Sequence, residues 1–450
     1  MLPLSIIIPS YNRASLMDET LHSLTSQSRK DFQIILVDHG STDNTEEIYR
    51  KYKDILRISY SKIARDDYSP GAPRDFGVRR SETPFIMFID SGTVVPSQYI
   101  EAHLAFHHLH SNHIGVGLQY RKDDAGEEFD SLFQHGDIDQ AYVVVKQAQF
   151  QDMREGIDLE NSSIPWLFAW TANLSLPREA YFSAGGFDLD LNGWGFEDVD
   201  LCYRLSKQGL HISFVEDGWS IEIPQPRQSM QERMESGQRN MLHCYFKQRS
   251  LVLESLILAG MLLRKAIGVY RSLPTTGPEA LSTLIEKIRS EPHQQTEEIF
   301  RYLTTVGQDC VALPPSILDQ VRSQFTRPTL FIGGSVQEAQ WYDYTTLVDE
   351  SKVSTTSTWS CCGIRIPLAD HSLETVIVSD IWQKLNWSVQ YSFGVSSMSL
   401  LEVLISEIQR TAKRAVFIHS PSVLLDHTSL SIEALEGLCR KYSLSFQLVR

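Results

Sequence analysis

The sequence predicts an α/β protein with two α/β domains separated by a helical segment, and three observations support this fold class. At the start of the chain, the apolar runs Leu4 to Pro9 and Phe32 to Val37 flank a helical pattern from Ala14 to Ser26. After about Pro226, long helical patterns replace this alternation. The alternation then begins again with the apolar run Thr329 to Ile332. Buried strands that alternate with helices are typical of parallel sheets built from βαβ units.

These changes in pattern predict three parts of the chain. Residues 1–228 form the first α/β domain, residues 229–327 a helical extension or linker, and residues 328–450 a smaller, Rossmann-like α/β domain. The helical patterns Leu251 to Tyr270 and Ala280 to Leu303 fall in the middle part. That part is the expected surface for a homo-oligomer.

Composition restricts the classes of function. The 450 residues contain 41 Lys and Arg against 56 Asp and Glu, a net charge of −15, without a basic run. This balance excludes nucleic acid as an expected partner. The six cysteines have neither C-x-x-C nor zinc-ligand spacing, which indicates reduced thiols. The apolar segment Leu251 to Leu263 contains Glu254 and is too short to cross a bilayer, so a cytoplasmic chain without a transmembrane segment is expected.

The stretch Ala184 to Leu205 carries the strongest chemical signal. Glu197 and Asp198 stand where a turn containing Trp194 leads into a helical pattern. Acidic side chains at a helix start are also explained by the N–H groups and the dipole of that helix. Glycine turns on both sides of an aromatic residue, however, let the backbone approach a ligand closely. A carboxylate placed there can accept a proton from a hydroxyl group.

This stretch resembles the acceptor motif of GT-A glycosyltransferases of family 2 and their galactosyltransferase-like relatives, N-x-S-x-P…GGFDE…GWG-x-ED. The matching residues are Asn173, Ser175, Pro177, Gly185, Gly186, Phe187, Asp188, Gly193, Trp194, Gly195, Glu197, Asp198, Asp200, Leu201 and Arg204. The resemblance implies the GT-A nucleotide-diphospho-sugar transferase fold and an inverting hexosyltransferase. It assigns the general base to Asp198, acceptor binding to Glu197 and a wall of the donor site to Trp194.

The first two predicted strands end in polar residues at the edge of the sheet where ligands bind. The segments Pro9 to Asn12 and Asp38 to Asp43 resemble the family's nucleotide-binding forms P-x-Y-N and V-D-D-G-S-x-D. Asx turns and helix caps are the alternative interpretation of each segment. The resemblance assigns donor binding to Pro9, Tyr11, Asn12, Asp38 and His39. Because His39 replaces the aspartate that contacts uracil, base specificity is open, and a UDP-sugar is the expected donor.

Two further segments resemble the family's diphosphate and metal motifs. Arg74 stands where the arginine of A-R-N-x-G approaches the diphosphate, and Asp90-Ser91-Gly92 replaces D-x-D, which holds Mn²⁺ or Mg²⁺. Asp90 and Ser91 are therefore assigned to the donor. Glu222 lies about where relatives place a metal-binding histidine. Either Asp90 and Glu222 bind the metal together, or the site has decayed or works without metal. We expect the first, because a charged side chain in an apolar strand needs a partner.

Other candidates have simpler structural interpretations. His103 and His107 have the i,i+4 spacing of a shared metal site, but packing histidines are expected because no glutamate completes a zinc motif. Trp166 and Trp170 either stack on a sugar or belong to the core. The acidic stretch Tyr120 to Asp139 is predicted to be an exposed loop and a candidate lid.

In the carboxyl-terminal part, the segment Ile366 to Asp380 is followed by the helical pattern Leu400 to Arg410 and the strand Ala415 to His419. These segments resemble class I S-adenosylmethionine-dependent methyltransferases. The strand Thr329 to Ile332 is followed by Gly333-Gly334, and the next strand ends at Asp349, an arrangement typical of dinucleotide sites. The glycine turn lacks the second spaced glycine of G-x-G, so its backbone approaches a cofactor less closely. We therefore expect a non-catalytic or acceptor-presenting module.

Together these features predict metal-assisted transfer of a sugar to an acceptor hydroxyl or thiol with inversion. The acceptor is a glycan, a peptide or a small molecule. A non-catalytic scaffold that binds nucleotide sugars or glycans is one alternative. A bifunctional glycosyltransferase-methyltransferase is the other.

Overall fold

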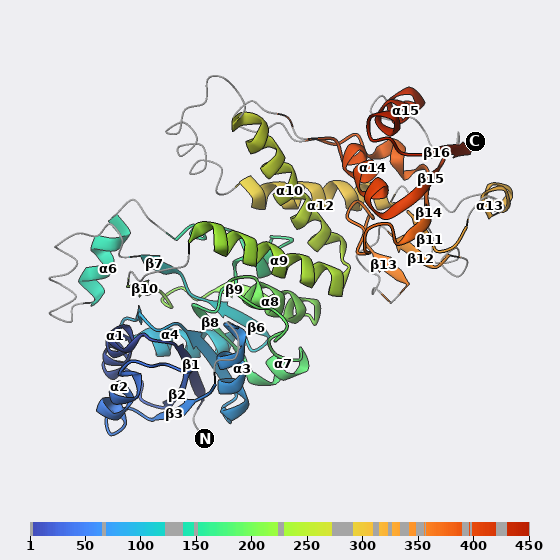
Figure 1. The fold of residues 1–450 in the computed structure, drawn as a ribbon. Coiled ribbons are helices and arrows are strands. Elements are labelled where there is room, and N and C mark those ends of the chain that lie inside the picture. Colours follow the sequence, from blue (N-terminus) through green and yellow to red (C-terminus); the bar gives the residue numbers. More distant parts are fainter. Residues whose placement is uncertain are drawn as a thin grey trace. The chain divides into compact units, whose positions relative to one another are not determined.

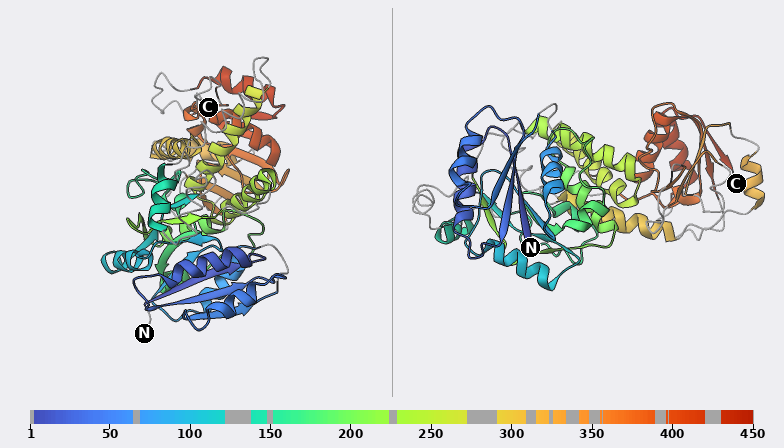
Figure 2. Two further views of the ribbon diagram at one scale, coloured as in Figure 1. Left: turned by 90° about the vertical axis from the view of Figure 1, so that its left-hand side faces the viewer. Right: turned by 90° about the horizontal axis from the view of Figure 1, so that it is seen from below.

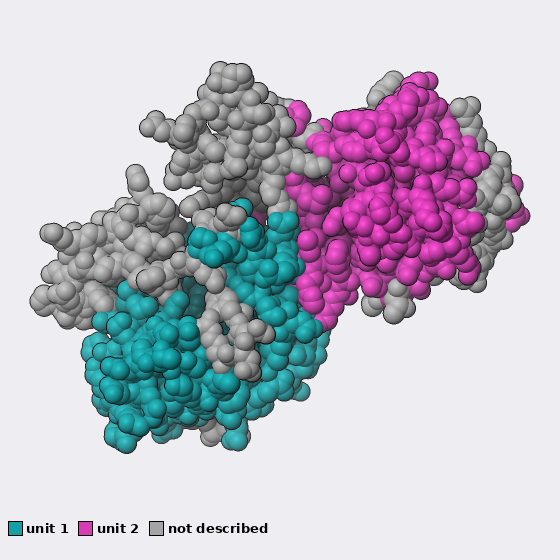
Figure 3. Space-filling model, viewed as in Figure 1, with its two compact units in different colours: residues 1–241 teal, residues 242–450 magenta. Residues whose placement is uncertain are grey.

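The computed structural model describes the chain in several ranges. They are residues 3–64, 69–121, 138–147, 152–223, 229–271, 291–308, 315–322, 326–333, 342–347, 355, 357–388, 396, 398–419 and 430–449. The chain divides into two compact units, residues 1–241 and 242–450, which Figure 3 colours separately. The predicted three-part division with boundaries after residues 228 and 327 stays a prediction.

The first unit alternates strands and helices (Figure 1). Its strands are β1 (Leu4–Ser10), β2 (Phe32–Asp38), β3 (Ile58–Lys62), β4 (Phe85–Ile89), β5 (Thr93–Val94), β6 (His113–Val116), β7 (Gln119–Arg121), β8 (Asn173–Pro177), β9 (His211–Phe214) and β10 (Ser220–Glu222). Its helices are α1 (Ala14–Thr25), α2 (Thr45–Tyr52), α3 (Gly71–Arg80), α4 (Tyr99–Leu109), α6 (Ile138–Gln147), the 3₁₀ helix η1 (Pro165–Phe168), α7 (Arg178–Ser183), α8 (Glu197–Lys207) and the start of α9 (Met230–Gln248).

The main sheet of this unit has the strand order β3-β2-β1-β4-β8-β6-β9. Strands β1 to β4 are parallel, and β8 runs antiparallel to both of its neighbours. The predicted strands at Leu4 and Phe32 and the predicted helix at Ala14 are confirmed to within a residue or two. Because β1, β2 and β4 are parallel, their carboxyl ends meet at one edge, where ligands bind in such sheets.

Helices cover both faces of this sheet (Figures 1 and 2). Alternate strand residues such as Ile6, Ile34 and Met87 share one apolar core with α1, α2 and α4. On the opposite face α3 packs so closely that a Cβ at Gly77 would lie 2.5 Å from the Ile7 side chain. A glycine is needed at this contact to bring α3, and Arg74 on it, against the sheet.

A small second sheet, in the order β5-β10-β7, completes the first unit. Strand β10 pairs antiparallel with β5, so that Glu222 lies opposite Thr93. Strand β5 follows the Asp90-Ser91-Gly92 turn directly. The predicted strand around Glu222 is thus confirmed, and it lies beside that turn.

The second unit is also α/β. Its strands are β11 (Thr329–Ile332), β12 (Tyr344–Leu347), β13 (Thr358–Ser360), β14 (Leu373–Val378), β15 (Ala412–Ile418) and β16 (Phe446–Val449). Its helices are the end of α9, α10 (Leu251–Arg271), α12 (Glu291–Gln308), α13 (Pro315–Arg322), the 3₁₀ helix η3 (Asp380–Lys384), α14 (Leu400–Thr411) and α15 (Ile432–Lys441).

The strands of the second unit form a parallel sheet in the order β13-β12-β11-β14-β15-β16. This is the order of doubly wound, Rossmann-type folds, as predicted. Residues of α10 and α12, including Leu258 and Leu303, share its main core with Trp359 and Val376. The predicted helices at Leu251 and before Leu303 therefore pack on this sheet.

The methyltransferase resemblance stays a prediction. The glycine turn after Gly333 and the acidic residue Asp349 lie outside the described residues. The prediction of an oligomer surface on the middle helices is likewise untested.

Two predictions from composition can be compared with the structure. The five cysteines in the described part of the chain are buried and unbridged, as expected for reduced thiols. Across the described ranges, no helix combines the length and apolar character needed to cross a bilayer. The cytoplasmic location stays a prediction.

Candidate functional site

The predicted donor residues gather at the carboxyl edge of the main sheet. Asn12 follows β1, Asp38 ends β2 and Asp90 follows β4. The Ser91 hydroxyl donates a 2.6 Å hydrogen bond to the Pro9 carbonyl oxygen, which ties the turn after β4 to the end of β1. The fold therefore brings together segments that are about 80 residues apart in the sequence.

Asn12 and Asp38 hold the loop after β2 in place. The Asn12 side-chain oxygen accepts a 2.7 Å hydrogen bond from the Thr42 N–H, in a backbone with a φ of +50° at Asn12. The buried Asp38 carboxylate accepts hydrogen bonds from the Ser41 N–H at 2.7 Å and the Tyr60 hydroxyl at 2.6 Å. These contacts correspond to the turn-forming interpretation of both residues.

Tyr11 and His39 lie on the same edge but differ in exposure. The Tyr11 side chain is 40% exposed, whereas His39 is buried and its N–H donates to the Ser10 carbonyl oxygen at 2.8 Å. An exposed aromatic ring at the end of β1 is suited to stacking on a flat ligand such as a nucleobase.

Arg74 connects the donor motif to the acceptor motif. Its Nη2 donates a 2.6 Å hydrogen bond to Asp90 Oδ1, and its Nη1 lies 3.6 Å from Glu197 Oε1. Nη1 also donates to the Pro70 carbonyl oxygen at 2.9 Å, and the arginine side chain is only 7% exposed. A buried guanidinium is stable here because carboxylates from both motifs surround it.

Burial and mutual repulsion shift the acidity of Glu197 and Asp198. Burial, followed by the negative charge of Asp198, raises the Glu197 pKa to about 8, although the positive charge of Arg74 lowers it. Burial also raises the Asp198 pKa, while Arg74 and backbone N–H groups, including those of Val199 and Thr171, lower it. Two adjacent carboxylates with different environments are the arrangement from which proton-transfer roles arise.

The Asp198 carboxylate is held in a defined orientation. Its Oδ1 accepts a 2.8 Å hydrogen bond from the Val199 N–H, and its Oδ2 accepts one of 3.3 Å from the Thr171 N–H. The role of Thr171 was not predicted, because a backbone donor leaves no side-chain signal in the sequence. Its position, two residues before the N-x-S-x-P motif, was the available clue.

Glu197 and Asp198 follow a turn with unusual backbone angles. Gly193, Gly195 and Phe196 have φ values of +83°, +93° and +77°. For a non-glycine residue such as Phe196 this conformation costs about 1–2 kcal/mol. Such strain is typical of functional sites, because surrounding contacts must maintain it. The Trp194 side chain in the middle of the turn is 42% exposed.

The third acid of the cluster, Asp200, has a structural role. Its carboxylate accepts a 2.9 Å hydrogen bond from Arg204 Nε, and Arg204 Nη2 donates to the Gly186 carbonyl oxygen at 2.7 Å. Asp75, which replaces the family's asparagine, likewise points into the fold, where it accepts a 2.8 Å hydrogen bond from the Tyr181 hydroxyl.

Asp90 is partly exposed and lies beside the strand that carries Glu222. The Asp90 side chain is 37% exposed, and its hydrogen bond with Arg74 uses only Oδ1. The strand that carries Glu222 lies against the same turn, because the Ile223 N–H donates to the Gly92 carbonyl oxygen at 2.9 Å. Carboxylate oxygens are the ligands that Mn²⁺ or Mg²⁺ prefers, and a metal site shared by Asp90 and Glu222 stays a prediction.

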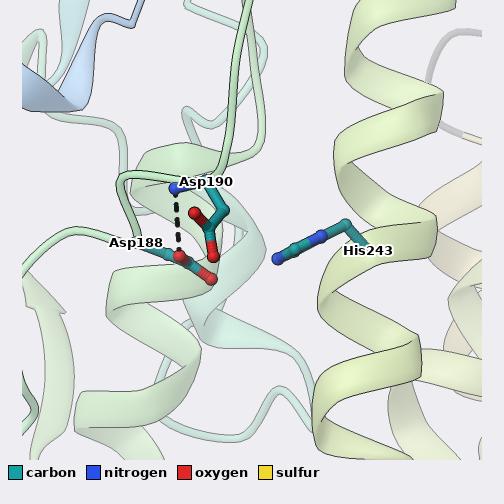
Figure 4. Close-up of side chains that lie close together, drawn as sticks. All are labelled: Asp188, Asp190 and His243. Atoms are coloured by element: carbon teal, nitrogen blue, oxygen red, sulfur yellow. Dashed lines mark hydrogen bonds between the residues drawn. The ribbon is translucent and has the colours of Figure 1, made fainter.

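Figure 4 shows a second acidic pair in the turn that follows Phe187. The Asp190 N–H donates a 3.2 Å hydrogen bond to Asp188 Oδ1, which closes this turn before Trp194. His243, also labelled there, belongs to the second compact unit, and we assign no ligand set that combines residues of both units.

The histidine pair on α4 packs inside the fold, as expected. His103 Nδ1 and His107 Nε2 each lie 2.8 Å from the Ser175 hydroxyl oxygen. Burial lowers their pKa values to about 3 and about 4. Both therefore stay neutral at ordinary pH.

The two tryptophans before Asn173 differ in their surroundings. Trp166 is buried, with its ring centroid 5.2 Å from that of Tyr203, so it belongs to the core. Trp170 is half-buried, and the Arg154 guanidinium carbon lies 4.4 Å from its ring centroid. The candidate lid lies mostly outside the described residues, which omit 122–137.

Comparison with known protein families identifies two matching regions. Residues 5–157 match the glycosyl transferase family 2 model, and residues 159–226 match the model described as the N-terminal domain of galactosyltransferase. Together these regions contain every predicted site residue from Pro9 to Glu222.

Similar proteins extend the comparison beyond these regions. The chain is 30% identical over 406 residues to validoxylamine A glucosyltransferase of Streptomyces hygroscopicus subsp. jinggangensis (strain 5008), which covers 84% of this chain and 90% of the relative. It is 26% identical to chondroitin synthase of Escherichia coli over 239 residues, or 50% of this chain and 35% of that protein. A crystal structure of Staphylococcus aureus TarS 1–349 with UDP-GlcNAc is 19% identical, with a TM-score of 0.46 over 67% of this chain and 90% of that one.

Proposed function

The chain belongs to glycosyl transferase family 2, and from this premise we propose that the site around Arg74, Glu197 and Asp198 transfers a hexose to an acceptor hydroxyl. The first unit has the GT-A fold of these nucleotide-sugar-dependent, inverting glycosyltransferases.

Asp198 is the proposed general base. The acceptor oxygen attacks the anomeric carbon of the donor sugar, its proton passes to an Asp198 carboxylate oxygen, and the bond from that carbon to the nucleoside diphosphate breaks. One displacement inverts the anomeric centre. The base must be ionised before it acts, and Arg74 together with the Val199 and Thr171 N–H groups stabilises the ionised form.

Glu197 is the proposed acceptor-binding residue. Its raised pKa keeps a larger share of it protonated than an ordinary glutamate near neutral pH. A protonated carboxyl group can both donate and accept hydrogen bonds, so it is suited to a sugar-like hydroxyl group. It would hold the acceptor next to Asp198, the following residue on α8.

Arg74 and Asp90 form the proposed diphosphate side of the site. The guanidinium offers planar donors that suit phosphate oxygens, and it lies between the two halves of the site. Asp90 and Glu222 are the residues that would hold Mn²⁺ or Mg²⁺. When bound, such an ion neutralises charge on the departing diphosphate.

The observation that carries this proposal is the pair of contacts from Arg74 to Asp90 and Glu197, at 2.6 and 3.6 Å. A scaffold that had lost its activity would not need a buried cation shared by the donor and acceptor motifs. The intact arrangement therefore favours an enzyme over a non-catalytic binding protein.

The similarity to the validoxylamine A glucosyltransferase guides the choice of substrates. The validoxylamine A glucosyltransferase matches both compact units, since the alignment covers 84% of this chain. We therefore propose glucose as the transferred sugar, UDP as the nucleotide, and a small hydroxylated molecule such as validoxylamine A as the acceptor. Glycans and peptides are the acceptor classes to compare with it.

A thermal-shift panel on the full chain tests the donor site. UDP-, GDP-, dTDP- and CDP-glucose are each added with Mn²⁺ and with a chelator, because a ligand that binds only the native state raises its melting temperature. We expect UDP-glucose to give the largest shift, and the chelator to reduce it. Glu222→Gln should raise the Mn²⁺ concentration needed. No shift with any nucleotide sugar would contradict the proposed function.

A further inference from the structure

The first three turns of α9 hold the turn that carries Trp194. Asn240 Nδ2 donates a 2.8 Å hydrogen bond to the Gly195 carbonyl oxygen. Arg239 Nη2 and the Ser236 hydroxyl donate to the Asn192 carbonyl oxygen at 3.1 and 3.4 Å. All of these residues belong to the first compact unit. The sequence pattern placed this part of the chain at the start of a linker, so their role was not predicted.

The fit between α9 and this turn leaves no room for larger residues at one position. A Cβ at Gly193 would lie 2.2 Å from Ser236 Oγ, and the φ of +83° there also disfavours other residues. A Cβ at Gly195 would lie 3.6 Å from the Gly237 Cα, an ordinary contact distance. The close approach at Gly193 shows that helix and turn pack directly together.

The same helix also contacts the Trp194 side chain. The Arg233 guanidinium carbon lies 4.0 Å from the centroid of the indole ring, while 42% of the tryptophan remains exposed. Arg233, Ser236, Gly237 and Asn240 follow the i, i+3, i+4, i+7 spacing of one helix face. One face of α9 therefore holds both the backbone of the turn and its aromatic side chain.

This turn fixes the position of the two acids. Gly195 is followed by Phe196, with its φ of +77°, and then by Glu197 and Asp198 at the start of α8. A strained backbone keeps one geometry only when neighbouring contacts hold it. Asn240 supplies a directed contact one residue before that strained position.

We propose that Asn240 and Arg233 are positioning residues for sugar transfer, which rests on the function proposed above. Asn240 holds the Gly195 carbonyl so that Asp198 meets the acceptor oxygen. Arg233 fixes the Trp194 ring, which we place as a wall on the acceptor side of the site instead of the donor side expected from the resemblance. Reaction rates are sensitive to such placement, because a displacement of about 1 Å at a reacting group can cost a factor of about 100.

Steady-state kinetics on the full chain test this proposal, with UDP-glucose, Mn²⁺ and validoxylamine A as probes. The variants are Asn240→Ala, Arg233→Ala and Arg233→Lys, and Met234→Ala is the matched control. Met234 lies on the same helix but is 59% exposed. Nucleotide release without acceptor and the UDP-glucose thermal shift are measured in parallel, so that donor binding is followed separately.

The two positions should give different kinetic signatures. We expect Asn240→Ala to lower kcat by about 10- to 100-fold while the KM for the donor changes by less than about twofold. Arg233→Ala should raise the KM for the acceptor about two- to fivefold at nearly constant kcat, and Arg233→Lys should recover part of this loss. Met234→Ala should behave as the wild type.

Other results would overturn the proposal. Equal kcat values for Asn240→Ala and Met234→Ala would exclude the positioning role of Asn240. A loss of kcat in Asn240→Ala that comes with an equal loss of donor binding and a lower melting temperature would exclude it as well. If Asn240→Ala does not fold, an unchanged acceptor KM in Arg233→Ala overturns the proposal. A wild-type chain that binds and turns over no nucleotide sugar contradicts the proposed function instead.

Discussion

Arg74 donates a 2.6 Å hydrogen bond from Nη2 to Asp90 Oδ1, so the cation of α3 is paired with the acid that follows β4. The other end of the same guanidinium lies 3.6 Å from Glu197. One buried cation therefore influences the charge of both the donor and the acceptor motif. Replacement of Arg74 should therefore change the behaviour of the donor motif and of the acceptor motif together.

The first prediction concerns Arg74→Lys. A lysine carries one compact charge and cannot contact both carboxylates with a planar fork, so we expect kcat to fall about 100-fold. Arg74 lowers the pKa values of Glu197 and Asp198 through its charge, and a lysine that cannot contact both motifs stabilises the ionised acids less, so both pKa values should rise. The acidic limb of the kcat/KM profile against pH should therefore move to higher pH.

Arg79→Lys is the control for this experiment. Arg79 lies on the same helix and pairs with Asp75, but its side chain is 58% exposed. Its replacement should leave the pH profile unchanged. An Arg74→Lys profile of kcat/KM against pH that coincides with that of the wild type would argue against a role of Arg74 in setting the acidity of both motifs.

The second prediction distinguishes the structural role of Asp200 from the proposed catalytic role of Asp198. Asp200→Asn weakens the buried pair with Arg204, which holds the Gly186 carbonyl oxygen. We expect the free energy of unfolding to fall by about 1–3 kcal/mol, with kcat within about fivefold of wild type. Denaturant unfolding and kinetics measure the two effects.

An exposed pair provides the comparison for Asp200→Asn. Glu46 and Arg50 form a surface i,i+4 pair, so Glu46→Gln should cost less than about 1 kcal/mol. A large loss of kcat in Asp200→Asn without loss of stability would indicate that Asp200 takes part in the chemistry.

The third prediction concerns the pH dependence of stability. The folded-state pKa of Glu197, about 8, lies above its ordinary value of 4.5, mainly because of burial. The native state thus binds this proton more tightly than the unfolded state. The resulting stabilisation is complete below pH 4.5 and is lost as the pH rises through about 8.

Glu197→Gln removes this titration. The melting temperature of the variant relative to that of the wild type should therefore be higher at pH 8 than at pH 5. Thermal unfolding at both pH values measures the difference. A difference that does not change with pH would contradict the raised pKa.

The fourth prediction concerns Gly92, which occupies the last position of the metal motif. Its φ is +96°, its N–H donates to the Thr20 hydroxyl oxygen at 2.9 Å, and a Cβ there would meet Leu16 at 3.4 Å. Gly92→Asp would restore the family's D-x-D, yet we expect it to destabilise the fold by about 1–3 kcal/mol.

Gly185→Ala is the matched variant for Gly92→Asp. Gly185 has a φ of +85°, and a Cβ at this position would meet no neighbouring atom within 4 Å. The loss of stability in Gly185→Ala therefore measures the cost of the positive φ without steric crowding. Stability is read from denaturant unfolding, and metal affinity from the Mn²⁺ dependence of donor binding. A stable Gly92→Asp variant that binds Mn²⁺ more tightly would show that Gly92 is not required by the backbone.

The sequence was sufficient to predict the main elements and the gathering of the candidate site residues at one edge of the sheet. Continuous apolar runs such as Leu4 to Pro9 predict buried parallel strands, and parallel strands bring their carboxyl ends together. The position of Glu197 and Asp198 at a helix start follows from the helical pattern after them. The strand at Glu222 pairs antiparallel with β5 in a second sheet, and its place beside the Asp90 turn was expected from the family resemblance and not from this pattern.

Contacts between distant segments were not predictable from local patterns. The hydrogen bond from Asn240 to Gly195 joins residues 45 positions apart, and that from Tyr181 to Asp75 spans 106 positions. Such pairs depend on the packed three-dimensional structure rather than on periodicity. For the same reason, the structural role of Asp200 could not be separated from the chemistry assigned to its neighbours.

The most direct test of the account compares nucleotide release by the wild type and Asp198→Asn, with UDP-glucose and validoxylamine A. The account predicts that the variant retains the donor-induced thermal shift but releases UDP at least about 1,000-fold more slowly, because only the base is lost. Release by the variant at the wild-type rate would contradict the assignment of Asp198 as the base. So would a variant that no longer binds the donor.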